Sequence, residues 1–401
     1  MSVRRGGLAL GAVALTAAFA TGSRALGVVG VGFIMAGALT WLWAWLADAP
    51  VSLTQRITPA RAVEGDRVRV AIEARRLSRV PLGSMTVRLS AGRLGERSIR
   101  LQSRGRRAVG ELDLGRLPRG VYTLSDTVVD FGDLLGLVTV TPVVAYEPAT
   151  IVVRPRLAAL DGLFSDAGRA VGDGRRVLLR RSAGFDFHSV RQHEQGESLR
   201  RVHWPTSARR GQLMVKELQD TSNDGVVVIL DCDPRCTTGV PPDASFDTAV
   251  RAAGSLLQAH ASRGRQATLV STGRARAVVP VRTAAGDLDG AIGQLAAAEP
   301  DALEGLARFL GSDHGWLAGS ELVAVTATTD PGAVVQLLAL TARRLVSVVW
   351  IDAASFVGRP TRAEPGLLRL AAHGVPTAVV RRGDDLASVL SARVLQEVAR
   401  A

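Results

Sequence analysis

The stretch GVVVILDCD, residues 225–233, is an uninterrupted apolar run that ends in two acidic residues. A strand buried on both faces of a parallel sheet has this continuous pattern, whereas a half-exposed strand alternates. Similar runs follow at 266–272, 321–329, 345–352 and 376–381, and segments with helical spacing separate them. The first such segment, 245–262, has Ser245 as its expected N-cap. The second half of the chain therefore predicts a doubly wound α/β sheet.

Acidic residues follow two of these expected strands. Asp231 and Asp233 come after the first, and Asp330 comes after 321–329. Ligands of such folds bind at the carboxyl ends of the strands, and carboxylate oxygens suit Mg²⁺. In von Willebrand factor A domains an Asp-x-Ser-x-Ser loop holds the ion, but here the second serine position is Arg235, whose charge repels a cation. Two interpretations stay open: a degenerate Mg²⁺ site, or carboxylates that cap the next turns and pair with arginines.

Immediately upstream, GESLRRVHWPTSARRGQLMVKE (196–217) concentrates arginines, a histidine, a tryptophan and Lys216, the only lysine of the chain. Histidines and acids near it could transfer protons, but their spacing matches no zinc signature, and Ser207 lacks the glycines of a nucleophile elbow. Residues 212–218 alternate like a strand, and Trp204 offers a large apolar anchor. We therefore predict no catalytic residue here, and expect a structural clip or a surface for a partner.

The same stretch resembles the signature of a bacterial family, the domain of unknown function numbered fifty-eight. Its glycines, arginines, tryptophan and Leu-x-Val-Lys-Glu ending are all present, with Glu197 where the family favours aspartate and His193 where it favours tyrosine. The residues that the resemblance marks for signature or interaction roles are Gly184, Arg191, Gly196, Glu197, Arg200, Trp204, Ser207, Arg209, Lys216 and Glu217.

This resemblance implies a membrane-anchored cytoplasmic protein with a helical hairpin, a β-rich region and a von Willebrand A-like α/β half. Members are often paired with a MoxR-type AAA+ ATPase, and no catalytic activity is established for the family. The chain is therefore expected to be an adaptor for such an ATPase and not an enzyme. No cofactor is expected, other than Mg²⁺ if the degenerate site binds it.

Between the N-terminal segment and the signature, residues 51–158 alternate with period two, as in 67–76, 84–91 and 121–130. Turn residues separate these short strands, which is typical of an antiparallel β-sandwich. Residues 159–183 are rich in glycine and arginine and lack periodicity, so they are expected to be a linker. The signature and the α/β domain would then occupy 184–401.

The first 47 residues hold two charge-free runs, 6–23 and 25–47, separated by Arg24. They predict two transmembrane helices, with tryptophans at 41, 43 and 45 in an interfacial belt. Arginines flank the pair at positions 4, 5, 56 and 61 and are scarcer in the short loop, so both ends are expected in the cytoplasm of an inner-membrane protein. The alternative is a signal peptide cleaved after Ala20, which would leave the second helix as an anchor.

The chain of 401 residues has a formal net charge of +12. Such a charge suits an anionic bilayer or nucleic acid, but the arginines are scattered, which disfavours nucleic acid. The two cysteines, Cys232 and Cys236, are too few for a metal cluster and fit a reducing compartment. A metal-dependent hydrolase that uses Asp231, Asp233 and Asp330 remains the first alternative function, and nucleic-acid binding the second.

Overall fold

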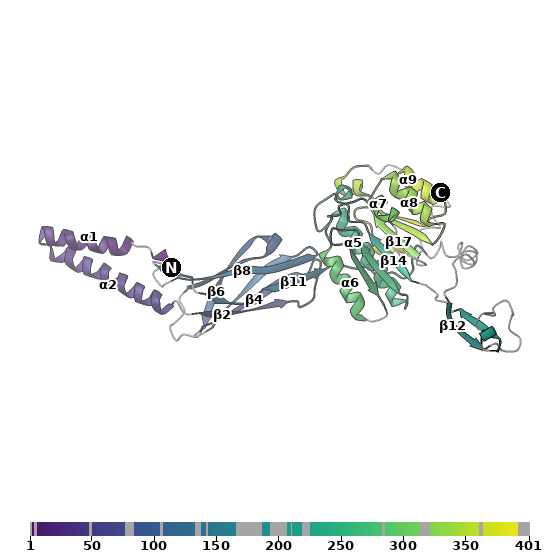
Figure 1. The fold of residues 1–401 in the computed structure, drawn as a ribbon. Helices are drawn as coiled ribbons and strands as arrows, with labels where there is room; N and C mark the ends of the chain where they lie inside the picture. The colour runs from purple at the N-terminus through teal and green to yellow at the C-terminus, as the bar shows by residue number, and fades with distance from the viewer. Residues whose placement is uncertain are drawn as a thin grey trace. The chain divides into compact units, whose positions relative to one another are not determined.

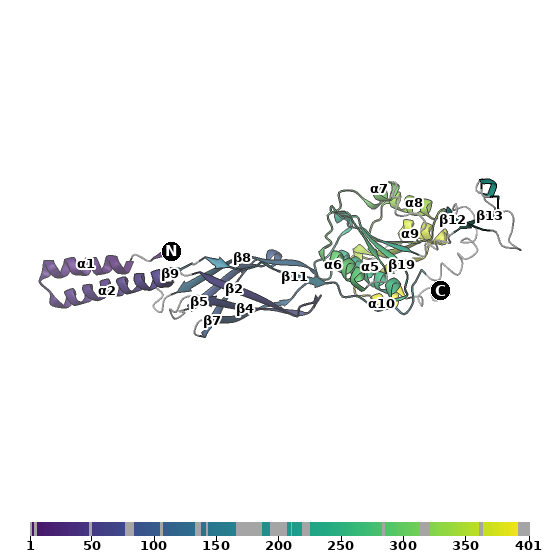
Figure 2. The ribbon, with the colours of Figure 1, turned by 60° about the horizontal axis from the view of Figure 1, so that its bottom comes forward.

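The computed structural model divides the chain into two compact units, residues 1–154 and 155–401. Figures 1 and 2 show the elements of each. The structure describes residues 2–3, 6–47, 50–76, 84–104, 107–132, 138–141, 143–165, 187–192, 207–209, 211–218, 225–282, 285–312, 321–360 and 364–391.

The first unit begins with two apolar helices, α1 (Gly6–Thr21) and α2 (Arg24–Ala47). Within the described residues, one helix is long and apolar enough to cross a membrane, over Arg24–Trp45. The expected first span is a shorter apolar helix, so the double span remains a prediction.

Glycines let α1 and α2 lie close together. A Cβ added to Gly30 would come within 2.8 Å of Leu15 Cγ, and one added to Gly11 would come within 3.0 Å of Phe33 Cβ. Small residues at a helix–helix contact bring the two backbones near enough for extensive van der Waals packing, the main attraction available between helices in lipid. The hairpin predicted from the sequence is thus present as a packed helix pair.

The rest of the first unit is a curled sheet of eleven strands with the order β1-β9-β8-β5-β6-β7-β4-β2-β10, in which β11 pairs with β8 and β3. Most pairs are antiparallel, as expected for 51–158, whereas β10–β2 and β11–β3 are parallel. The strands are β1 (Ser2–Val3), β2 (Val51–Thr58), β3 (Ala62–Val63), β4 (Arg67–Arg76), β5 (Ser84–Ser90), β6 (Glu96–Arg104), β7 (Arg107–Arg116), β8 (Gly120–Gly132), β9 (Val138–Val140), β10 (Val144–Ala145) and β11 (Ala149–Arg154).

Strand β6 makes the sheet curl. Its first part, Glu96 to Leu101, pairs with β5, and its last part, Gln102 to Arg104, pairs with β7. Because one strand changes partner along its length, the two halves of the sheet fold over a single core. That core contains alternate residues of β4, β5 and β8, among them Ile72, Met85 and Phe131.

The second unit has a six-stranded sheet with the order β16-β15-β14-β17-β18-β19. Its pairs are parallel except β15–β16, and the chain runs outward from β14 in both directions. The doubly wound arrangement predicted from the apolar runs is present. The strands are β14 (Val226–Leu230), β15 (Ala267–Ser271), β16 (Ala277–Val281), β17 (Glu321–Thr326), β18 (Val346–Ile351) and β19 (Thr377–Val380).

Helices cover both faces of this sheet (Figures 1 and 2). Val228 and Leu230 of β14 pack in one core with α5 and α6, whereas Val227 and Ile229 pack in a second core with α7 and α8. The helices are α5 (Ser245–Ser262), α6 (Ala285–Ala297), α7 (Leu306–Gly311), α8 (Pro331–Leu340), α9 (Pro365–Ala372) and α10 (Leu386–Leu390).

Two expectations differ from the structure at the edges of elements. The compact units divide at Arg154/Pro155, and Leu163 and Phe164, placed in the expected linker 159–183, are buried in the α/β core. Ser245 is the first residue of α5 and not its N-cap, because its hydroxyl accepts a hydrogen bond from Thr238 N (2.9 Å) in the preceding loop.

Candidate functional site

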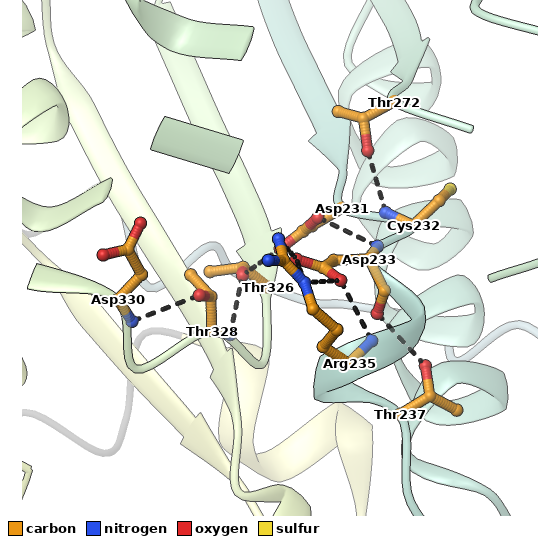
Figure 3. A network of polar contacts seen from close by, with 9 residues as sticks. All are labelled: Asp231, Cys232, Asp233, Arg235, Thr237, Thr272, Thr326, Thr328 and Asp330. Atoms are coloured by element: carbon orange, nitrogen blue, oxygen red, sulfur yellow. Dashed lines mark hydrogen bonds and ion pairs between the residues drawn. The ribbon is translucent and has the colours of Figure 1, made fainter. Parts of the chain in front are cut away.

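The carboxyl edge of the α/β sheet gathers the acidic residues that the sequence singles out (Figure 3). β14 and β17 are parallel neighbours, so their carboxyl ends open at the same edge. Asp231 follows β14, and its N–H donates to Val325 O (3.0 Å), which continues the ladder for one residue. We call this edge, from Asp231 to Cys236 and from Thr326 to Asp330, the rim.

Asp231 is buried in the rim and is hydrogen-bonded through both carboxylate oxygens. Oδ2 accepts from Thr326 Oγ1 (2.6 Å), and Oδ1 accepts from Asp233 N (3.2 Å). Burial raises the pKa of Asp231 above the ordinary aspartate value, since the charged form loses water, although the bond from Thr326 acts in the opposite direction. Asp231 therefore ties the ends of β14 and β17 together.

Asp233 is paired with the next arginine. The Nε and Nη2 of Arg235 approach Asp233 Oδ2 at 3.1 and 2.6 Å, and Arg235 N donates to Oδ1 (2.9 Å), which begins the 3₁₀ turn Pro234–Cys236. Hydrogen bonds from the Arg235 side chain lower the pKa of Asp233. The Arg235 side chain is 74% exposed while that of Asp233 is 6% exposed. The ion pair therefore joins a buried carboxylate to a guanidinium that faces solvent.

Asp330 caps helix α8. Its Oδ1 accepts from Gly332 N (3.0 Å), and Pro331 occupies the first turn. Two threonines connect it to the strand end, because Asp330 N donates to Thr328 Oγ1 (3.2 Å) and Thr328 N donates to Thr326 Oγ1 (2.9 Å). A chain of hydrogen bonds thus leads from Asp231 through Thr326 and Thr328 to the start of α8.

These contacts favour capping and pairing over metal binding. Asp233 already has a guanidinium against both oxygens, Asp330 holds a helix N-terminus, and Asp231 is engaged at both oxygens. Within the described residues no group of three or more His, Cys, Asp or Glu side chains is placed to hold an ion. The residues present do not fit a Mg²⁺ site, because the positive charge beside Asp233 comes from the chain itself.

The two cysteines lie at the rim as free thiols. Cys232 is buried, with its Sγ 3.2 Å from Ser271 Oγ, and burial raises its pKa. Burial also raises the pKa of Cys236 to about 11. Since the thiolate is the nucleophile, neither side chain is activated for covalent chemistry at neutral pH.

A cleft adjoins the rim where β17 and β18 meet α8 and α9. Thr328, Trp350, Glu364 and Leu367 are among its lining residues. The indole Nε1 of Trp350 donates to Thr328 O (3.3 Å), which fixes the ring against the rim loop. The cleft therefore offers an aromatic and aliphatic surface next to the polar network.

Around the rim, two loops present exposed aliphatic side chains. Val240, 78% exposed, lies between the Asp233 turn and α5, and Leu303, 77% exposed, lies between α6 and α7. The second loop is held at the rim, because Ala302 N donates to Cys232 O (3.0 Å). Cationic and apolar groups thus occur together at this edge.

The signature residues are only partly described. Gly184, Gly196, Glu197, Arg200 and Trp204 lie outside the described residues. Strand β12 (Phe187–Gln192) carries Arg191, and β13 (Met214–Leu218) carries Lys216 and Glu217. The two strands form an antiparallel pair in which Arg191 opposes Val215, so the expected strand at 212–218 has a partner within the signature.

Ser207 has a structural role in this segment. Its buried Oγ accepts from Met214 N (2.8 Å) at the start of β13. The hydroxyl thereby closes the turn that leads into the strand. Arg209, two residues further along, is exposed.

Sequence reasoning missed several rim residues that organise the site. Two threonines hold the loop after β14. Thr326 donates to Asp231 Oδ2, and Thr272 Oγ1 accepts from Cys232 N (2.9 Å). The apolar pattern of 345–352 places Trp350 in a strand but gives no sign that its indole contacts the rim. The positions of the two threonines could have indicated their role, because Thr326 is the last residue of β17 and Thr272 directly follows β15, so both lie at the carboxyl ends of strands beside β14.

A protein-family model described as "Protein of unknown function DUF58" matches residues 189–310. The match runs from β12 to α7 and includes the Asp231–Arg235 part of the rim. The chain is 25% identical over 203 residues to the uncharacterized protein YeaD of Bacillus subtilis (strain 168), covering 51% of this chain and 49% of the relative. The matched segment thus spans about half the length of that relative.

Two solved structures show weak similarity. The crystal structure of BslA, a bacterial hydrophobin, aligns with a TM-score of 0.18 and 18% identity, over 26% of this chain and 99% of that chain. Cwp6 from Clostridium difficile aligns with a TM-score of 0.17 and 10% identity, over 74% and 37% of the respective chains. At these TM-scores neither similarity carries an inference.

Proposed function

We propose that this chain is a membrane-anchored interaction protein that acts as an adaptor for a MoxR-type AAA+ ATPase. In this proposal α1 and α2 form a two-span hairpin in the inner membrane, and both soluble units lie in the cytoplasm. In the same proposal the α/β unit is a von Willebrand A-like domain that presents the rim and the signature segment to the ATPase.

The observation that carries the proposal is how the rim uses its polar groups. Asp231, Asp233 and Asp330 all stabilise the protein's own loops, and the thiols of Cys232 and Cys236 have raised pKa values. A catalytic edge needs a group poised to react or to bind substrate. Because the acids of the rim are bonded to groups of the chain itself, the rim supports a role in binding another protein and not in catalysis.

The exposed groups at the rim indicate the chemistry of the partner surface. Arg235 points outward beside the apolar Val240 and Leu303 loops, and arginine with aliphatic groups is typical of protein interfaces. An acidic and apolar patch on the ATPase would complement this surface.

Co-purification with a MoxR-type AAA+ ATPase of the same organism tests the proposal. Arg235→Ala should weaken binding about tenfold or more, as expected for an arginine at an interface centre. Arg282→Ala, an exposed arginine just after β16 at the opposite edge of the sheet, is the matched control and should bind normally. Replacement of Arg200, Trp204 and Arg209 tests whether the signature segment also binds the ATPase. Unchanged binding in every variant would contradict the proposal.

The two alternatives predict different measurements. A metal-dependent hydrolase requires Mg²⁺ or Mn²⁺ binding, so calorimetric titration that detects micromolar affinity, lost in Asp231→Ala, would favour it over the adaptor. A nucleic-acid-binding protein would show affinity for DNA that falls steeply with salt. We expect neither result.

A further inference from the structure

Arginines form a row across one end of the curled sheet. Arg75 of β4 is the direct register partner of Arg107 of β7, and Arg107 is also the partner of Arg104 of β6. Arg76, the last residue of β4, lies at the same end. We call Arg75, Arg76, Arg104 and Arg107 the arginine row.

Like charges directly opposite each other on neighbouring strands are destabilising. Glu73 offsets part of the cost, since its Oε1 lies 3.5 Å from Arg107 Nε. That side chain of Arg107 remains 55% exposed, and Arg75 is exposed as well. Arg75 and Arg107 against this carboxylate carry a net positive charge that an external anion could stabilise.

The position of the row identifies the anion. In the register of β2 with β4, Val51 opposes Arg76 and Ser52 opposes Arg75. Val51 is four residues after Ala47, the end of α2, so Val51 lies at most about 14 Å from the end of that helix, and Arg76 is its partner on the neighbouring strand. Tryptophans 41, 43 and 45 precede it, where an interfacial belt would lie.

We propose that the arginine row binds the phosphate groups of anionic lipids in the bilayer that α2 enters. Each arginine held near an anionic surface contributes about 1 kcal/mol of attraction, which is screened beyond roughly 8–10 Å. The row thereby fixes the sheet against the headgroup layer, in addition to the anchor. This inference rests on the membrane anchor of the proposed function, but not on any ATPase.

The chain supplies a matched control on the same two strands. At the opposite end of β4 and β7, Arg67 opposes Arg116, and Arg67 is paired with Asp113 (3.1 Å). Arg75→Gln/Arg107→Gln and Arg67→Gln/Arg116→Gln therefore make identical chemical changes at opposite ends of one strand pair.

Hydrogen–deuterium exchange of the full chain in lipid nanodiscs tests the proposal. The discs contain phosphatidylcholine alone or with phosphatidylglycerol. Amides around Arg75 and Arg107 should exchange several-fold more slowly in the anionic discs, and high salt should remove the difference. The Arg75→Gln/Arg107→Gln protein should lose it, while the Arg67→Gln/Arg116→Gln protein should keep it.

Equal exchange in both kinds of disc would overturn the inference, as would a difference that survives in Arg75→Gln/Arg107→Gln or disappears in the control protein. Failure of the chain to enter nanodiscs at all would contradict the membrane anchor and this inference with it. Entry without lipid-charge dependence would contradict the arginine row alone.

Discussion

At the scale of single residues, Asp231 and Asp233 have pKa values that shift in opposite directions within one turn. Burial raises the pKa of Asp231, whereas hydrogen bonds from Arg235 lower that of Asp233. A carboxyl group with a lowered pKa stabilises the fold above its unfolded pKa, and this contribution is lost as the pH falls through the folded pKa. A raised pKa has the opposite sign, so its stabilising effect is lost as the pH rises.

Asparagine at these two positions should therefore give opposite pH profiles. Relative to the unchanged protein, Asp233→Asn should lose stability as the pH rises toward the ordinary aspartate pKa of 3.8, because hydrogen bonds from Arg235 ionise Asp233 in the folded protein below that value. Asp231→Asn should gain relative stability as the pH rises above 3.8, since it avoids burying a charge. Urea unfolding at several pH values measures both, and parallel profiles would contradict the assigned environments.

The thiol of Cys236 gives a second prediction at this scale. With a pKa of about 11, roughly a hundredfold less thiolate is present at pH 8 than for a cysteine with a pKa of 9. Alkylation by iodoacetamide should be slower in the folded protein by about this factor, and mass spectrometry can follow it. Unfolding in urea provides the control, and fast alkylation of the folded chain would contradict the described packing.

Sequence reasoning at the residue scale recognised the rim acids but not what holds them. The spacing of Asp231, Asp233 and Arg235 indicates a degenerate cation site, or carboxylates that cap turns and pair with arginines, and leaves the choice between them open. The bond from Thr326 to Asp231 joins residues 95 positions apart, and only the register of β14 with β17 brings them together. Long-range contacts of this kind depend on topology and cannot be inferred from local pattern.

At the scale of elements, the helix pair depends on where its glycines face. An added Cβ at Gly30 meets Leu15 in α1, whereas one at Gly32 meets nothing within 4 Å. Both glycines lie in α2 and differ by two positions. They therefore separate the effect of packing from that of helix propensity.

Gly30→Val should weaken the α1–α2 contact, while Gly32→Val should leave it intact. Loss of close backbone approach removes van der Waals packing that lipid cannot replace at the same distance. Thermal unfolding of the full chain in detergent, followed by circular dichroism, should show a midpoint several degrees lower for Gly30→Val alone. Equal midpoints for the two variants would contradict the packed hairpin.

The sequence predicted most elements of the α/β unit, because buried parallel strands are continuous apolar runs. It missed β16, whose five residues include Pro280 and follow β15 as an antiparallel edge. A proline is tolerated at a sheet edge, yet in sequence it argues against a strand. The sequence also does not show that β6 pairs first with β5 and then with β7. Alternation of apolar and polar residues indicates which face of a strand is buried, but not which strands lie beside it.

At the scale of the whole molecule, the proposed function combines a membrane anchor, formed by α1 and α2, with the curled sheet and the α/β unit. Two apolar helices, a curled sheet with an arginine row and an α/β unit whose rim acids are bonded within the chain support the proposal of a scaffold that works at a membrane. The boundary at Arg154/Pro155 could not be placed from the sequence, because Leu163 and Phe164 lie beside a segment of weak periodicity but pack into the α/β core.

The central claim is that the chain after Ala47 faces the cytoplasm from a membrane anchor. Protease added to spheroplasts, and separately to inverted membrane vesicles, tests it most directly, with an antibody to the α/β unit as the readout. We predict that this unit survives in spheroplasts, sediments with membranes and is digested in inverted vesicles. Digestion in spheroplasts, or recovery of the full chain in the soluble fraction, would contradict the account.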